Sequence, residues 1–267
     1  MNISSMIGSI VIGLVLAFGV FLGSSDPKIF INAHALILVF GGTIGITLVI
    51  YPFSRLVDII DFFAFAFLVR SGKNSLKVAT ELIGGVQAYY RNPNDVNLES
   101  SAAHPFIKEA FALLAYSQLT FEQLQFILEN RKESFRIKYQ EEAKTIATIA
   151  KFPPALGLLG ASAGIIEMMS GLGMGGSSSI GHAMAVALVA TFWGITLANF
   201  GILPLGDYAH RVAEEDLHMR EMIIEGVLMI KRGFPENVVI EQMRSRLPLK
   251  ERAALTQKMG ALSNARP

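Results

Sequence analysis

The side chains that could bind a metal or do nucleophilic chemistry are few in this chain. It contains no cysteine, which excludes disulfides, thiolate catalysis and cysteine-ligated metal centres. No two of its five histidines share a helical turn, so the sequence predicts no metal site. The histidines are His34, His104, His182, His210 and His218.

Cofactor-binding motifs are also missing. We expect no Walker A loop, no HExxH zinc motif, no GxSxG nucleophile motif and no GxGxxG fingerprint between a strand and a helix. The glycine-rich segment Gly171–Gly181 holds no Lys or Arg that could pair with a phosphate, so we interpret it as a connector. The net charge of +1 gives no general basic field, so nucleic acid is not an expected partner. We therefore expect no enzyme activity, no catalytic residue and no cofactor.

The composition is typical of a membrane protein. Hydrophobic residues make up 52% of the chain and charged residues 17%, whereas about a quarter of a soluble domain is charged. Four stretches are apolar over about the 20 residues that a helix needs to cross the hydrocarbon core. They predict membrane spans at Ile3–Gly23, Ile31–Pro52, Pro154–Gly173 and Ala183–Leu205.

The positions of Lys and Arg predict how these spans are oriented. The loop between the first two spans holds only Lys28, and the loop between the last two holds neither residue type. The other basic residues follow the second or the fourth span, so we expect both termini in the cytoplasm. The predicted domains are residues 1–52 with spans one and two and a short periplasmic loop, 53–151 as a helical cytoplasmic domain, 152–207 with spans three and four, and 208–267 as a cytoplasmic tail.

The sequence predicts helices in the cytoplasmic segments. Phe53–Arg70 is amphipathic, which favours a helix lying in the inner membrane interface, with a buried helix of the cytoplasmic part as the alternative. A capping box at Thr120-Phe-Glu-Gln123 starts a helix that can run to about Ala150. The predicted fold class is all-α: a polytopic inner-membrane protein with four transmembrane helices, an interfacial helix and a helical cytoplasmic domain. Further cytoplasmic helices are predicted at Lys77–Tyr90, Pro105–Ser117 and His210–Arg232, with a short one ending near Arg246.

Small residues form a stripe along each of the last two spans. Such stripes let helix backbones approach closely in lipid, where no hydrophobic effect drives helices together. We therefore expect spans three and four to pack tightly, against each other or against another chain. The stripes are Gly157, Gly160, Ala161 and Gly164 in span three, and Thr191, Gly194, Ala198 and Gly201 in span four.

Three further positions in these spans are unusual. Pro154 and Pro204 lie near the inner ends of spans three and four, where a proline creates a point at which a helix can bend. Glu167 is a carboxylate inside the apolar limits of span three, about 20 Å beyond Pro154 at 1.5 Å per residue. That places it toward the outer surface, where it either reaches into the interface or serves as an ion entrance.

Several segments together resemble one family. They are Leu38-Val-Phe-Gly-Gly-Thr43, Phe152-Pro-Pro-Ala-Leu-Gly-Leu-Leu-Gly160, Ala190-Thr-Phe-Trp-Gly-Ile-Thr-Leu-Ala-Asn199 with Pro204 after it, and Ile223-Ile-Glu-Gly-Val-Leu228. With the order of short and long loops, these segments make the chain resemble MotA/PomA, the stator subunit family of the bacterial flagellar motor. The resemblance covers nearly the whole chain.

The resemblance implies a motor function in motility and chemotaxis. It implies a homopentamer of this chain around a dimer of a MotB-like single-span protein, which carries the proton-accepting Asp. Ion flow through the inner membrane would turn the ring, and the cytoplasmic loop would push on the rotor protein FliG. Arg91 and Glu99 match the spacing of the family's rotor-facing pair, and Pro154, Ala161, Thr191 and Pro204 fall at its ion path and hinge.

The resemblance also implies which ion flows. Sodium-type relatives carry a Thr seven positions after the span-three proline, where this chain has Ala161. Thr191 matches a Thr shared by both types. One missing oxygen ligand matters for sodium and little for a proton, so a proton channel is favoured.

Two alternatives to a rotary motor remain. An ExbB/TolQ-like proton-driven energiser would act on an outer-membrane system without a rotor, although members of that group usually have three spans. A secondary transporter would show charged or polar residues at mid-membrane and repeats between its halves, and neither is evident in the sequence. A neighbouring reading frame with one span and a peptidoglycan-binding domain would favour the motor.

Overall fold

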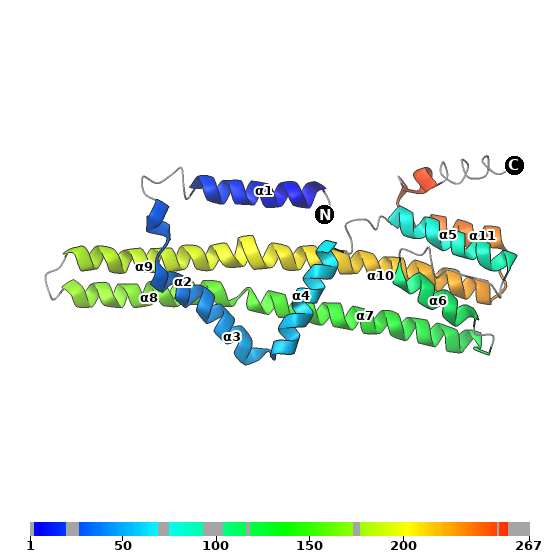
Figure 1. Ribbon diagram of the computed structural model, residues 1–267, viewed down its shortest axis with the longest axis horizontal. Helices are drawn as coiled ribbons and strands as arrows, with labels where there is room; N and C mark the ends of the chain where they lie inside the picture. Colours follow the sequence, from blue (N-terminus) through cyan, green and yellow to red (C-terminus); the bar gives the residue numbers. More distant parts are fainter. Residues whose placement is uncertain are drawn as a thin grey trace. The chain divides into compact units, whose positions relative to one another are not determined.

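A computed structural model of the chain describes residues 3–19, 27–68, 75–92, 104–115, 118–172, 177–249 and 251–255 (Figure 1). The elements in this part of the chain are helices without strands, which confirms the all-α prediction. In chain order they are α1 (Ile3–Ala17), η2 (Pro27–Phe30), α2 (Ala33–Leu36), η3 (Ile37–Gly41), α3 (Gly42–Ile50), α4 (Phe53–Leu68), α5 (Ser75–Arg91), α6 (Pro105–Ala115), α7 (Phe121–Ile149), α8 (Phe152–Leu172), α9 (Ser177–Thr196), η5 (Leu197–Ile202), α10 (Leu203–Lys231) and α11 (Glu236–Ser245).

The helices group into two compact units. The first is formed by Met1–Leu68 and Tyr139–Arg211, and the second by Val69–Lys138 and Val212–Pro267. The long helices α7 and α10 contribute residues to both units. The predicted cytoplasmic loop and the predicted tail therefore supply the second unit together.

The first unit is built around α8 and α9, which lie side by side (Figure 1). Glycines on α8 allow the close approach: a Cβ on Gly157 would lie 2.9 Å from the carbonyl oxygen of Ala190, and one on Gly164 would lie 2.6 Å from that of Ala183. The prediction that these helices pack tightly is confirmed, and they pack against each other. Gly201, the last member of the α9 stripe, meets only Leu197 of its own helix.

Helices α2, η3 and α3 form one bent segment on this pair. Val39 packs against Ala190, and Gly42 lies so close to Leu156 that a Cβ there would come within 2.9 Å of it. The indole N–H of Trp193 donates to the carbonyl oxygen of Phe30, 2.7 Å away.

Three helical stretches of the described chain are long and apolar enough to cross a membrane, judged by length and composition. They lie within Ala33–Ile50, Phe121–Gly171 and Ile180–Lys231 and overlap the predicted spans two, three and four. The first predicted span is described as α1, from Ile3 to Ala17, and residues 20–26 lie outside the described part. The count of four spans therefore stays a prediction.

The two proline positions differ from each other. Helix α7 ends at Ile149 and α8 begins at Phe152, so Pro153 and Pro154 occupy the first turn of a new helix, where no amide donor is needed. Pro204 does not interrupt its helix, contrary to the expected break. The preceding turn, η5, is a π-helix in which the amide of Leu203 donates to the carbonyl of Ala198. This wider turn accommodates the proline.

Helix α4 forms over most of the predicted amphipathic segment. Its Arg55 donates to Glu141 of α7, with 2.7 Å between nitrogen and oxygen. Ile59 is buried, while Phe53 and Ile60 are exposed. This mixed pattern is compatible with both predicted placements of the helix, and both remain open.

The second unit has a hydrophobic core between α5, α6, α7, α10 and α11. The capping box that was predicted to start α7 is confirmed: the amide of Gln123 donates to the hydroxyl of Thr120 at 3.3 Å, and the side chain of Gln123 accepts from the amide of Thr120 at 3.0 Å. The largest fully buried apolar side chains of this core are Leu82, Phe106, Ile107, Leu124, Leu128, Ile223, Met243 and Leu255.

Candidate functional site

Thr191 is a polar side chain at the contact between α8 and α9. Its hydroxyl lies 3.1 Å from the carbonyl oxygen of Ala187 and 3.4 Å from that of Gly157 across the helix pair. The hydroxyl can give its single hydrogen to only one of these carbonyls at a time, and its oxygen keeps lone pairs for a further partner. Thr191 therefore places a hydroxyl oxygen at the contact between the two helices.

Ala161 and Pro154 lie on α8 and are half-buried. Ala161 offers a methyl group and no oxygen. The neighbouring Pro153 is buried, and its carbonyl oxygen faces Gly194 of α9. The sequence singled out Pro154, but the proline whose carbonyl meets the facing helix is Pro153.

The segment Gly160-Ala-Ser-Ala-Gly164 has the GxSxG spacing of a hydrolase nucleophile elbow, so the expectation that the chain lacks this spacing is wrong. An elbow needs a sharp turn between a strand and a helix. Here Ser162 lies in the interior of α8, is exposed, and donates to the carbonyl oxygen of Leu158 at 3.0 Å. The spacing is therefore that of a small-residue packing stripe.

The remaining predicted site residues are spread over the chain. Glu167 is exposed on α8. Arg91 is exposed at the end of α5, and Glu99 lies outside the described residues. The structure therefore does not test the pairing of these two charges. Tyr90, beside Arg91, donates its hydroxyl to the carbonyl oxygen of Phe234, and burial raises the pKa of Tyr90.

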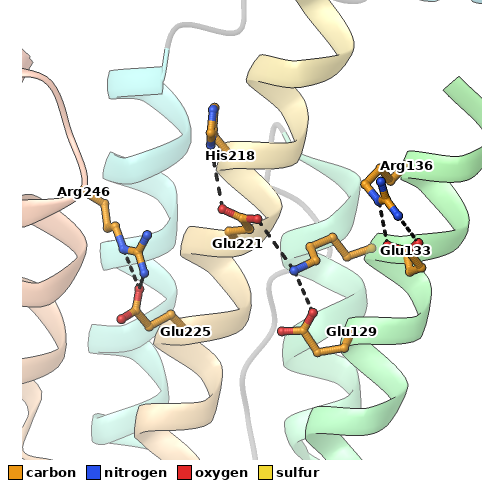
Figure 2. A network of polar contacts seen from close by, with 8 residues as sticks. Glu129, Glu133, Arg136, His218, Glu221, Glu225 and Arg246 are labelled. Atoms are coloured by element: carbon orange, nitrogen blue, oxygen red, sulfur yellow. Dashed lines mark hydrogen bonds and ion pairs between the residues drawn. The ribbon is translucent and has the colours of Figure 1, made fainter. Parts of the chain in front are cut away.

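A charged groove of about 520 Å³ lies in the second unit between α7, α10 and α11. Lys132 lies between two carboxylates, 2.7 Å from Glu129 and 3.7 Å from Glu221. Both carboxylates are labelled in Figure 2. Arg246 lies 2.7 Å from Glu225 on the other wall. These charges are paired within the chain, and Arg232, which also lines the groove, lies over the ring of Phe121. The geometry of the groove therefore indicates packing of the helices.

A second polar cluster links α6 and α10. His104, which is 1% exposed, places its Nε2 atom 2.9 Å from Asp216, and the other carboxylate oxygen of Asp216 accepts from Arg220 at 2.7 Å. Burial alone would raise the pKa of Asp216, but the hydrogen bond from His104 and the charge of Arg220 hold this pKa below its ordinary value. From the sequence, His104 was considered only as a possible metal ligand. The i, i+4 spacing of Asp216 and Arg220 was the available signal for an ion pair.

A family model matches part of the chain. Residues 99–222 match the MotA/TolQ/ExbB proton channel family. The chain is 25% identical over 264 residues to motility protein A of Bacillus subtilis, covering 97% of this chain and 95% of that protein. It is 26% identical to motility protein A of Cereibacter sphaeroides, covering 94% and 97%. A shorter match, 33% identical over 100 residues, covers 38% of this chain and 39% of the chemotaxis protein PomA of Vibrio alginolyticus.

Two solved structures share this fold. A chain of the C. jejuni MotAB structure superposes with a TM-score of 0.81 at 19% identity, covering 93% of this chain and 97% of that chain. A chain of the flagellar MotAB stator complex from Bacillus subtilis superposes with a TM-score of 0.80 at 24% identity and the same coverage. The helical architecture is therefore that of MotAB chains along nearly its full length.

Proposed function

We propose that this chain is a multi-pass membrane subunit of a flagellar motor stator, because residues 99–222 match the MotA/TolQ/ExbB proton channel family and nearly the whole chain is similar to motility protein A. The observation that carries the proposal is similarity to motility protein A over 97% of the chain. The matching region thus includes both the helix pair α8–α9 and the helices of the second unit. An ExbB/TolQ-like energiser is the second candidate, since the family model covers both kinds of protein.

The proposed ion path runs along α8 and α9 beside a MotB-like partner. In our proposal a dimer of this partner supplies the carboxylate, and this chain supplies the oxygen of Thr191 and the small surface of Ala161. Pro154 and Pro204 shape the inner end of the path. The tight contact between Gly194 and Pro153 supports this arrangement, because it makes the two helices move as one body.

The proposed output is a push on a FliG-like rotor protein through Arg91 and Glu99. A unit charge that crosses 100 mV releases about 2.3 kcal/mol. Surface ion pairs are each worth about 0–1 kcal/mol, so one ion can break several such contacts. The exposed position of Arg91 supports its part in this contact. We propose a pentamer of this chain around the partner dimer.

The proposed location is the inner membrane, with both termini and the second unit in the cytoplasm. Glu167 would then face the outer side, as an interfacial side chain or an ion entrance. Domain boundaries at residues 52, 151 and 207 follow from this topology. A reporter fused after Pro267 and one inserted at Gly176 should report opposite sides of the membrane. Two reporters on the same side would contradict the topology.

The function is tested by co-purification and by deletion. The tagged chain should bring down a single-span protein with an Asp near the start of its span and a peptidoglycan-binding domain. A deletion strain should keep its flagella but not swim. Loss of an outer-membrane uptake process with normal swimming would favour the energiser.

A further inference from the structure

The protonation pattern of His104 follows from its two neighbours. Its Nδ1 atom lies 3.2 Å from the backbone nitrogen of Phe106, and its Nε2 atom lies 2.9 Å from Asp216. A backbone amide can only donate, so Nδ1 is the acceptor and Nε2 carries the hydrogen that is donated to Asp216. The imidazole therefore joins the first turn of α6 to α10 through two hydrogen bonds.

Arg220 completes the cluster on the other side of Asp216. Its Nε atom donates to the second carboxylate oxygen, and its guanidinium lies 3.7 Å from the ring centre of Phe135 on α7 and 4.7 Å from that of Phe106 on α6. Both oxygens of the carboxylate are thus satisfied by charged or polar donors. Three helices of the second unit meet at this cluster, in which the side chain of Asp216 is 13% exposed.

The cluster lies at one end of the connection between α5 and α6. His104 directly precedes Pro105, the first residue of α6. At the other end of this connection, Tyr90 donates to the carbonyl oxygen of Phe234, just after α10 ends at Lys231. Both ends of the connection are therefore tied to α10 or to the turn that follows it.

We propose that His104, Asp216 and Arg220 are positioning residues that lock the start of α6 onto α10, so that displacement of α10 is delivered to the rotor-facing end of the second unit. The proposal rests on the proposed stator function, because displacement of α10 does work only in a chain that drives a rotor. A buried polar cluster is rarely the most stable way to fill a core, since well-packed apolar residues do this as well or better. Compared with apolar packing, hydrogen bonds of fixed geometry add a directional link between the two helices.

Two variants of the full stator complex separate the two hydrogen bonds of His104, and a third serves as a control. His104→Asn keeps an acceptor for the amide of Phe106, but its side chain is too short to reach Asp216. His104→Gln extends an amide donor toward Asp216 in place of Nε2. His218→Asn is the matched control, because His218 lies on α10 and its side chain is 78% exposed.

The first measurement is hydrogen exchange of the α6 amides in the purified complex. His104→Asn should speed exchange by about tenfold or more, the factor expected when a buried hydrogen bond to a charged group is lost. His104→Gln should stay close to the unsubstituted protein, and His218→Asn should equal it. Unchanged exchange in His104→Asn would overturn the lock. This measurement does not depend on motility, so it separates the lock from the stator function.

The second measurement is torque per stator unit at high load, with membrane assembly counted in the same cells. His104→Asn should assemble normally and deliver less torque, and His104→Gln should restore it. Normal torque despite faster exchange would show that the cluster only stabilises the fold and would overturn the positioning role. Failure of His104→Gln to restore torque would also overturn it. If the chain drives no motor at all, the deletion strain will swim normally, which identifies a failure of the proposed function instead.

Discussion

Gly194 of α9 lies against Pro153 of α8 so closely that a Cβ on Gly194 would come within 2.5 Å of the Pro153 carbonyl oxygen. No side chain beyond a hydrogen fits there without moving backbone. The contact joins the first turn of α8, just after the break that follows α7, to the last turn of α9. The N-terminal end of α8 is therefore held against the C-terminal end of α9.

Gly194→Ala should separate the two helices. Overpacking of this kind costs about 1–3 kcal/mol, so we expect less protein in the membrane and a lower melting temperature of the purified complex. Gly181→Ala on the same helix is the matched control, because nothing lies within 4 Å of a Cβ there. Equal melting temperatures for the two variants would contradict the close-contact interpretation.

Acid should weaken the second unit through Asp216. The pKa of Asp216 is lower in the folded protein than in the unfolded chain, so this carboxylate stabilises the fold when it is ionised. Its contribution is fully present above the unfolded pKa of about 3.9 and is lost as the pH falls through the folded pKa. Asp216→Asn should be less stable at neutral pH and should lose less stability below about pH 4. Unfolding followed by denaturant at several pH values measures both effects. An identical acid dependence in the two proteins would show that Asp216 is not a source of it.

Reversal of the charge at Arg91 should reduce torque without reducing assembly. Arg91→Glu and Glu99→Lys place like charges opposite the rotor, and a compensating reversal in the rotor protein should restore movement. Lys77→Glu is the control, since Lys77 is exposed on the same helix, α5, at its other end. The measurement is swimming speed with stator counting. Silent reversals at both positions, singly and together, would exclude this pair as the rotor contact.

Local signals in the sequence predicted much of this fold. They did not predict pairs of residues that lie far apart in the sequence. The capping box at Thr120 fixed the start of α7 because its partners are three residues apart. The small stripes predicted the α8–α9 contact. His104 and Asp216 are separated by 112 positions, and neither residue type specifies such a partner. The wide turn before Pro204 was also missed, because a proline indicates a disturbed helix without saying whether the helix ends or widens.

The wide turn gives Pro204 a testable role. Pro204→Leu restores an amide donor and removes the ring that the π-helical turn accommodates, so η5 can revert to a regular α-helix. A π-helical turn holds about one residue more than an α-helical turn. Its reversion to an α-helix would therefore rotate everything beyond it by about 100°. We expect normal insertion but loss of motility, and the same for Pro154→Leu through a stiffened start of α8. Normal swimming in both variants would exclude a hinge role for the prolines.

The ion that drives the motor should be the proton. Sodium is a hard cation that needs several oxygen ligands in place of its water, and Ala161 offers none where sodium-type relatives have a Thr. Ser162 does not replace it, since the next residue on a helix is rotated by about 100° and its hydroxyl already donates to the carbonyl of Leu158. Thr191 supplies a hydroxyl at the α8–α9 contact. A proton needs only the partner's carboxylate and a water path.

The test is swimming in sodium-free medium with a proton gradient, then with that gradient collapsed and sodium supplied. Speed should follow the proton gradient. Motility that follows sodium would overturn the assignment. Ala161→Thr adds the missing hydroxyl to a helix pair that already holds Thr191, so it should introduce a measurable sodium dependence. Ala155→Thr is the control, because Ala155 is exposed on the same helix, and it should introduce none. Unchanged ion dependence in Ala161→Thr would show that this position does not select the ion, and the selectivity would then have to come from the partner's span.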